Sequence, residues 1–282
     1  MAYEKQIEAI RACSKALLSQ GKVDRVLGYT AGGLEGASIP FFARTPEDAD
    51  KLVWGDRCVQ NLATYLHGRK DRVGIVAKPC DVRAIIQYIN ERQVNREQVY
   101  IIGVDCGGMV DAEGNSRAGC GECRVRIPPL FDTHVADSRV RQNENVRPEP
   151  EEDLAGSLEK FQREIDKCIL CYACRQACSG CYCPTCFIER DTPNWLPSEV
   201  DTGAKMTFHL GRAMHLAGRC VECGACESVC ASGVNLRYLF SEIAKFVEDA
   251  YDFRAGMTLD VTPPLAAYGS NDKEIGFLGG EA

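Results

Sequence analysis

Cys168-Ile-Leu-Cys171-Tyr-Ala-Cys174-Arg-Gln-Ala-Cys178 is the most informative stretch of this chain. The same spacing returns 52 positions later as Cys220-Val-Glu-Cys223-Gly-Ala-Cys226-Glu-Ser-Val-Cys230. In a C-x2-C-x2-C-x3-C run, three thiolates bind one cubane iron–sulfur cluster and the fourth reaches a neighbouring cluster. Zinc sites show C-x2-C in pairs and not in triples. The repeat therefore predicts two [4Fe-4S] clusters and a protein that transfers electrons.

Two ligand sets follow from this exchange of fourth cysteines. The first set is predicted to be Cys168, Cys171, Cys174 and Cys230. The second set is predicted to be Cys220, Cys223, Cys226 and Cys178. The bacterial ferredoxin run has a proline after its fourth cysteine, whereas Ser179 and Ala231 stand there in this chain. Because ligation needs only the thiolates, the missing prolines leave the choice of fourth ligand open.

Composition indicates a reducing compartment. The chain has 282 residues, 17 of them cysteines, and its 45% hydrophobic and 26% charged residues are ordinary for globular domains. Residues 1–8 are charged and lack the apolar core of a secretory signal, and the longest apolar stretch, 99–104, is far too short to cross a bilayer. We expect a cytoplasmic protein without a membrane span. A net charge of -7 argues against nucleic acid as a partner.

The first 135 residues are predicted to form an α/β domain with a partly parallel sheet. An apolar strand over 73–77, a helix over 81–91 and a second strand over 99–104 have the lengths of a crossover unit, which makes the two strands parallel. A helix is also expected over 3–19 and a strand over 25–29, followed by a glycine-rich turn over 30–36. A second helical stretch is expected over 45–68, with a break near Gly55.

The second half of the chain is predicted to be a separate, mainly helical domain. A linker rich in proline and charge is expected over 136–155, followed by a ferredoxin-like domain with two clusters over 156–250. Apolar spacing predicts helices over 206–216 and 235–250. The last residues, 251–282, have little periodicity and are expected to form an extended, fraying tail.

Four further cysteines predict a third cluster. Cys80 lies three residues past the first strand of the crossover and Cys106 lies two residues past the second. The carboxyl ends of parallel strands meet at one edge of a sheet, where ligand sites form. Cys120 and Cys123 follow after a short polar loop. Four thiolates from three loops can then bind a [4Fe-4S] cluster, and the alternative is a set of free thiols.

These motifs resemble the beta subunits of deazaflavin-coenzyme-reducing hydrogenases and formate dehydrogenases. The resemblance covers roughly residues 20–135 and is carried by Lys78-Pro-Cys80-Asp, Val104-Asp-Cys106-Gly and Cys120-x2-Cys123. In that family a Pro-Cys motif precedes a helix, a lone cysteine ends the next strand, and a Cys-x2-Cys pair completes a [4Fe-4S] site beside an FAD. The resemblance implies the corresponding four cysteines as ligands. This chain departs from the family in its short domain and in the position of its ferredoxin part, which follows that domain.

An FAD would need a loop for its phosphates, and the turn with Gly32, Gly33 and Gly36 is the one candidate. This turn follows a strand, but it does not match G-x-G-x-x-G and no clear helix is expected behind it. An ordinary tight turn is the favoured interpretation, since glycine is the default residue in such turns.

Five cysteines remain outside the three sets: Cys13, Cys58, Cys181, Cys183 and Cys186. Cys13 and Cys58 are expected to be small core residues. Three interpretations stay open for the other three cysteines. They bind a further cluster or metal with a remote ligand, one of them replaces Cys178, or they surround the clusters as free thiols.

The histidines do not indicate a site for acid–base catalysis. His209 and His215 lie on the helix that leads into the second cysteine run. Surface or capping roles are expected for both, because no carboxylate or cysteine shares their spacing. A hydrogen bond from one of them to a cluster sulfur is the alternative.

The predicted function is that of an iron–sulfur electron-transfer subunit in a cytoplasmic oxidoreductase with several subunits. The family resemblance implies a catalytic partner of the formate dehydrogenase, hydrogenase or aldehyde oxidoreductase type. At the far end it implies a flavoprotein or a partner like heterodisulfide reductase. One alternative is a beta subunit with its own FAD that reduces a deazaflavin-type carrier. A second alternative is a scaffold whose cysteines bind zinc.

Overall fold

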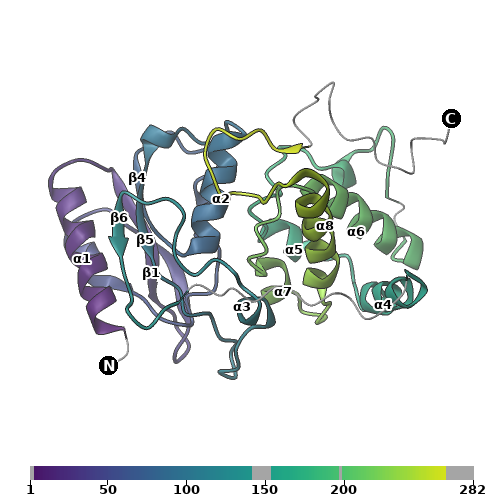
Figure 1. Cartoon of the computed structure of the whole chain (residues 1–282), viewed down its shortest axis with the longest axis horizontal. Helices are drawn as coiled ribbons and strands as arrows, with labels where there is room; N and C mark the ends of the chain where they lie inside the picture. Colours follow the sequence, from purple (N-terminus) through teal and green to yellow (C-terminus); the bar gives the residue numbers. More distant parts are fainter. Residues whose placement is uncertain (1–2, 142–153, 197–198, 265–282) are drawn as a thin grey trace.

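The computed structural model describes residues 3–141, 154–196 and 199–264 (Figure 1). Its buried apolar side chains form two cores. One core surrounds the sheet of residues 3–141, which we call the sheet half, and the other lies among the helices of residues 154–251, the helical half. Figure 1 shows the halves side by side along the long axis of the molecule, with α2 between the sheet and the helices of the helical half.

The sheet has six strands in the order β2-β1-β4-β5-β6, and β3 pairs with β1. Their bounds are β1 (Arg25–Ala31), β2 (Ser38–Ala43), β3 (Leu52–Val53), β4 (Val73–Ala77), β5 (Val99–Val104) and β6 (Thr133–Val135). Strands β1, β4, β5 and β6 are parallel, whereas β2 and β3 run antiparallel to β1. The predicted partly parallel sheet and its crossover are thereby confirmed. All of β4 is buried, as its apolar, β-branched sequence requires of a central strand covered on both faces.

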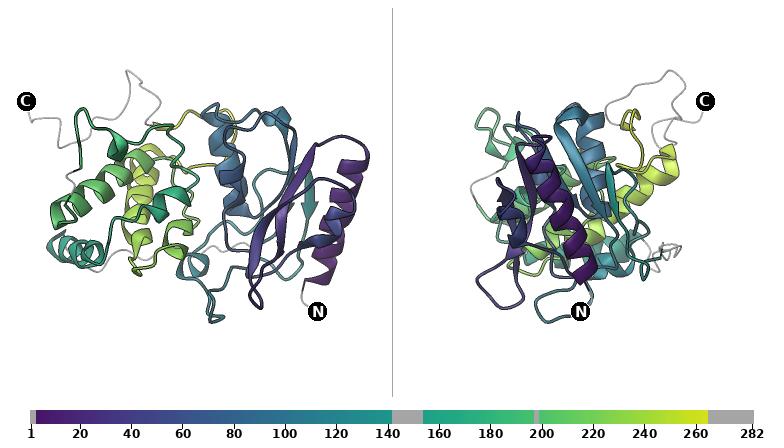
Figure 2. Two further views of the ribbon diagram at one scale, coloured as in Figure 1. Left: turned by 180° about the vertical axis from the view of Figure 1, so that it is seen from behind. Right: turned by 90° about the vertical axis from the view of Figure 1, so that its left-hand side faces the viewer.

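Two helices cover the two faces of the sheet (Figure 2). Helix α1 (Glu4–Ser19) lies on one face and ends before Gly21, whose φ of 61° suits glycine. Helix α2 (Pro79–Asn90) lies on the other face, towards the helical half. Proline at its first turn has no N–H to leave unpaired. The sheet half also contains the short helices η3 (Arg96–Gln98) and α3 (Ala118–Gly121).

The helix predicted over 45–68 is wrong. The structure has two short 3-10 helices there, η1 (Asp48–Lys51) and η2 (Leu62–Tyr65), with β3 after the first. Leu52 pairs with Thr30 of β1, and the sheet thus supplies the hydrogen bonds that a helix would have made. The strand β2 was also missed, because Pro40 lies within it. As an edge strand, β2 tolerates a residue that donates no ladder hydrogen bond.

The helical half consists of α4 (Leu154–Asp166), α5 (Ala173–Gln176), η4 (Phe187–Glu189), α6 (Thr202–Leu216), α7 (Ala225–Ser228) and α8 (Leu236–Tyr251). The helices predicted over 206–216 and 235–250 are confirmed as α6 and α8. Helix α6 packs against both α4 and α8 and buries Phe208 and Leu216. Its N-terminus is capped by Asp201, whose carboxylate accepts a hydrogen bond from the Ala204 N–H at 2.7 Å.

The first part of the tail does not fray. Residues 253–264 fold back along α2, where Arg83 Nε donates to the Ala255 carbonyl at 3.0 Å and Asn90 Nδ2 donates to the Thr258 carbonyl at 3.0 Å. The expected linker over 136–155 and the rest of the tail fall mostly outside the described residues. No helix in the ranges that the structure describes combines the length and the apolar character needed to span a membrane.

Candidate metal centres

The two cysteine runs fold into the same backbone shape. Leu170 and Tyr172 have positive φ angles of 52° and 60°, and Glu222 and Gly224, at the matching positions of the second run, have φ of 58° and 66°. A short helix follows in each run, α5 and α7, at the same offset. Left-handed backbone is uncommon outside glycine and is retained where a site demands it. The sequence repeat is therefore a structural repeat.

The first predicted ligand set comes together around one cavity. Burial and then the charges of the Cys230 and Cys171 thiolates raise the pKa of Cys168, so the last cysteine of the second run has joined the first run. The Leu170 N–H donates to Cys168 Sγ and the Val234 N–H donates to Cys230 Sγ, both at 3.3 Å. Such bonds favour thiolates. The cysteines that line this cavity are Cys168, Cys171, Cys174 and Cys230.

The second predicted set also comes together. Burial raises the pKa of Cys226 well above its usual range, and the charges of the other three thiolates raise it further. Cys178 has thus crossed over from the first run. The backbone N–H groups of Glu222 and Ala225 hydrogen-bond to Cys220 and Cys223. The cysteines brought together here are Cys220, Cys223, Cys226 and Cys178.

Cys181 is the alternative to Cys178 as the fourth ligand of the second set. The two thiols are hydrogen-bonded to each other, and this bond, with the charge of Arg212, lowers the pKa of Cys178 to about 5. The same bond and burial raise the pKa of Cys181. Arg212 Nε also donates to Cys181 Sγ at 3.4 Å. Because Cys178 lies close enough to act on Cys220, Cys223 and Cys226, the other thiols of the second set, this placement favours Cys178 as the ligand.

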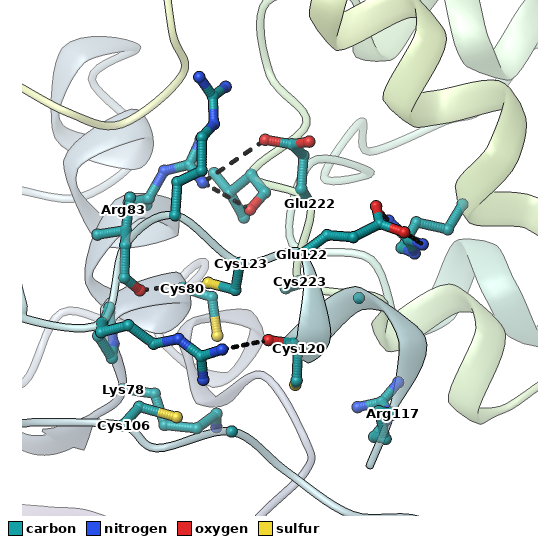
Figure 3. A pocket seen from close by; sticks show the side chains of 18 of the residues that line it. Lys78, Cys80, Arg83, Cys106, Arg117, Cys120, Glu122, Cys123, Glu222 and Cys223 are labelled. Carbon is teal, nitrogen blue, oxygen red and sulfur yellow. Dashed lines mark hydrogen bonds and ion pairs between the residues drawn. The ribbon is translucent and has the colours of Figure 1, made fainter. Parts of the chain in front are cut away.

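The third predicted set lies at the seam between the two halves (Figure 3). Cys80 and Cys106 follow the carboxyl ends of β4 and β5, as predicted, while Cys120 lies in α3 and Cys123 just after it. All four line a cavity of about 270 Å³, and Cys223 of the second set lines it as well. Burial raises the pKa of Cys106 to about 11, and the charges of Cys120 and Cys123 contribute to this rise.

The cavities of the first and third sets are each lined by the four predicted thiols, which is the donor set that a [4Fe-4S] cluster takes. Over residues 3–141, 154–196 and 199–264, no three Cys, His, Asp or Glu side chains converge on a point as ligands of one ion do. In a cubane each thiolate binds a different iron atom, so the four sulfurs stand farther apart. A further site at Cys181, Cys183 and Cys186 stays a prediction. Cys183 is exposed, whereas Cys181 lies against Arg212.

Cationic side chains surround the cavity at the seam. Arg117 Nη2 donates to the Gly224 carbonyl at 2.7 Å, and Arg83 Nη1 donates to the Val221 carbonyl at 3.0 Å. Arg83, Arg117, Arg124, Arg126, Arg237 and Arg254 all line it. Buried thiolates need such cations nearby. This role was not predicted, although Arg83, Arg117 and Arg124 each lie within three residues of a cysteine.

A buried lysine lies beneath Cys80. Lys78 is 1% exposed, and its ammonium pairs with Asp81 at 2.9 Å and donates to the Gln60 carbonyl at 2.7 Å. It also donates to the hydroxyl of Tyr29. Burial by itself lowers the pKa of Lys78, but Asp81, Tyr29 and Cys80 together raise it well above its usual range. The lysine of the Lys-Pro-Cys motif is therefore a permanent cation under the third set.

Two polar side chains, His209 and Arg212, lie inside the helical half. A different place was expected for His209, and no role was predicted for Arg212. His209 was expected at the surface or at a cap, yet it is 1% exposed. Arg212, one turn further along α6, is 3% exposed and its Nη2 donates to the Cys174 carbonyl at 2.9 Å. Their spacing of three on a helix was the available signal, since it puts both on one face.

The glycine-rich turn connects two antiparallel strands. Gly32, Gly33 and Gly36 lie between β1 and β2, with the Gly32 N–H donating to the Ala37 carbonyl at 2.8 Å. Gly36 has φ of 71°, which suits glycine. Strand β2, and not a helix, follows the turn along the chain. The favoured interpretation as a tight turn agrees with this geometry.

Two curated relatives of this chain are beta subunits of the same kind of enzyme. No family model matches the chain. The beta subunit of the F420-dependent formate dehydrogenase of Methanocaldococcus jannaschii is 23% identical over 91% of this chain and 93% of its own length. The beta subunit of F420-dependent formate dehydrogenase 1 of Methanococcus maripaludis is 24% identical over 91% of this chain and 92% of its own length. A chain of the F420-reducing [NiFe] hydrogenase complex from Methanosarcina barkeri matches with a TM-score of 0.32 and 18% identity, over 40% of this chain and 44% of that chain.

Proposed function

We propose that this chain, which fits the beta-subunit family of deazaflavin-coenzyme-reducing hydrogenases and formate dehydrogenases, relays electrons through three [4Fe-4S] clusters within an oxidoreductase complex. The helical half would be the ferredoxin-like part, with two of the clusters, and the seam would hold the third. When bound, such clusters accept and donate electrons at potentials that their surroundings set.

The continuity of the three cysteine sets is the observation that carries this proposal. Cys223 of the second set lines the cavity of the third set together with Cys80. Between the second and first sets, Arg212 interacts with the charges of Cys178 and Cys174, one from each set. The sets therefore form a row with the second set in the middle. A row of this kind supports a relay with two ends.

The two ends of the row differ in surroundings. At one end, Cys171 of the first set is exposed and its neighbour Ile169 is 60% exposed. At the other end, the third set lies in the basic cavity at the seam. We propose that one end meets a catalytic subunit of the formate dehydrogenase, hydrogenase or aldehyde oxidoreductase type. The other would meet a flavoprotein or a partner like heterodisulfide reductase.

Anaerobic metal and sulfide analysis of the purified chain tests the proposal. We expect about twelve iron and about twelve sulfide per chain, from four of each in a cubane. A fourth cluster at Cys181, Cys183 and Cys186 would raise both to about sixteen. Zinc without iron or sulfide would overturn the relay and favour the scaffold alternative.

A second candidate function keeps the relay and adds an FAD that reduces a deazaflavin-type carrier. The glycine turn and residues 53–58 line a surface hollow of about 480 Å³. Val59, the next residue, lines the cavity of the third set. A flavin in that hollow would thus adjoin the third set. Flavin released on denaturing the same anaerobic sample would support this version, and a flavin-free sample with full iron content would exclude it.

A further inference from the structure

His209 is a buried side chain without a hydrogen-bond partner. It is 1% exposed, and neither Nδ1 nor Nε2 has a partner among the described residues. The other histidines are in ordinary settings: His134 Nε2 is 2.7 Å from an Asp105 carboxylate oxygen, His67 stacks on Tyr182, and His215 is exposed beside Phe187. A buried imidazole that makes no hydrogen bond destabilises the fold, so an acceptor is expected next to it.

The surroundings of His209 indicate where that acceptor lies. His209 lines the same cavity as the four cysteines of the first set. The remaining lining is mostly apolar and includes Phe208, Val234 and Leu236. An imidazole carries at least one N–H donor in either protonation state, and His209 therefore has a donor to offer in this cavity.

We propose that His209 donates a hydrogen bond to a sulfur atom of the cluster held by Cys168, Cys171, Cys174 and Cys230, and that this bond raises the reduction potential of that cluster. The inference rests on the proposed function, since it requires a cluster in this cavity. Reduction adds negative charge to the sulfurs, and a donor therefore stabilises the reduced cluster more than the oxidised one. His209 is a positioning and tuning residue, not a ligand.

Redox titration of the anaerobic holoprotein, followed by electron paramagnetic resonance, tests the inference. The signal of the first cluster is assigned as the one that Cys171→Ser removes. In His209→Leu, which keeps the volume but lacks the donor, we expect the ratio of reduced to oxidised first cluster at a given potential to fall about tenfold, or about 59 mV. His209→Gln keeps an N–H donor and should shift the potential by less than half as much. His215→Leu, on the exposed side of the same helix, is the matched control and should leave all potentials unchanged.

Three outcomes separate the possibilities. Unchanged potentials in a fully loaded His209→Leu protein, or equal shifts in all three clusters, would overturn the inference and leave the relay intact.

If His209→Leu does not load its first cluster, pulsed electron paramagnetic resonance of the wild-type protein with ¹⁵N-labelled histidine decides. A nitrogen coupling to the reduced first cluster that His209→Gln lacks supports the bond, and the absence of any coupling overturns it. A wild-type protein without iron and sulfide would instead refute the proposed function.

Discussion

Cys80, after β4, and Cys223, in the second cysteine run, face the same cavity although one belongs to the sheet half and the other to the helical half (Figure 3). Burial raises the pKa of Cys80 most, and the Cys223 thiolate raises it further. Asn61 touches both, since its Nδ2 donates to the Cys80 carbonyl at 3.5 Å and its side chain hydrogen-bonds to the Cys223 thiol. The two halves therefore meet at their cysteines.

Replacing Cys80 by serine should remove one cluster. We expect iron to fall from about twelve to about eight per chain, because the other two sets keep all their thiolates. Iron and sulfide analysis measures this directly. The matched control is Cys13→Ser, since Cys13 lies in α1 with Thr133 as its neighbour, 3.8 Å away, and belongs to no predicted set. Unchanged iron in Cys80→Ser would remove the third cluster from the relay.

Cys178 and Cys181 should respond differently to the same substitution. Cys178→Ser is expected to lose the second cluster, about four iron per chain, because Cys178 lies with Cys220, Cys223 and Cys226. Cys181→Ser keeps a hydroxyl donor towards Cys178 and should retain full iron. The comparison is made by iron content and by the number of resonance signals. If Cys181→Ser loses the cluster and Cys178→Ser does not, the fourth ligand is Cys181.

Arg83→Met should weaken the seam. Arg83 is 3% exposed and donates to the carbonyls of Val221 and Ala255, both of which would be left buried without a donor. We expect a loss of about 3 kcal/mol, in the range for hydrogen bonds from charged groups. Anaerobic thermal unfolding measures the change. Arg163→Met is the control, because this arginine is 69% exposed and its ion pair with Glu159 spans 4.0 Å. Equal losses in both variants would contradict the role given to Arg83.

Gly256→Ala should detach the tail from α2. A Cβ at Gly256 would lie 2.0 Å from the Arg83 carbonyl oxygen, and φ there is +70°. Gly21→Ala provides the comparison, since its φ of +61° carries the same backbone strain but no atom lies within 4 Å of the added Cβ.

We expect Gly21→Ala to cost about 1 kcal/mol of stability from the left-handed backbone, and Gly256→Ala about 2–4 kcal/mol because overpacking adds to that strain. Thermal unfolding gives the stabilities, and limited proteolysis reports release of residues 253–264. A Gly256→Ala tail that resists protease as well as the wild-type tail does would refute the packing described for this segment.

Local pattern was sufficient for much of the architecture. The strand–helix–strand unit over 73–104 was predictable because apolar periodicity and the handedness of crossovers leave few choices. The same crossover rule put Cys80 and Cys106 at one edge of the sheet. The spacing of Cys168 to Cys178 and of Cys220 to Cys230 predicted the two groups of cysteines that the helical half brings together, and their role as ligands stays a prediction. These features depend on neighbours along the chain.

The remaining features depend on contacts between distant residues. Strand β3 exists because Leu52 meets Thr30, and residues 253–264 stay in place because Arg83 holds Ala255. The burial of His209 depends on how α6 packs against α4 and α8. Local periodicity does not predict these tertiary contacts. The free energy that favours them comes from burial and hydrogen bonds that form only when the chain folds. The cysteine spacings can be read from the sequence, whereas the contacts that link the three sets form only in the folded molecule.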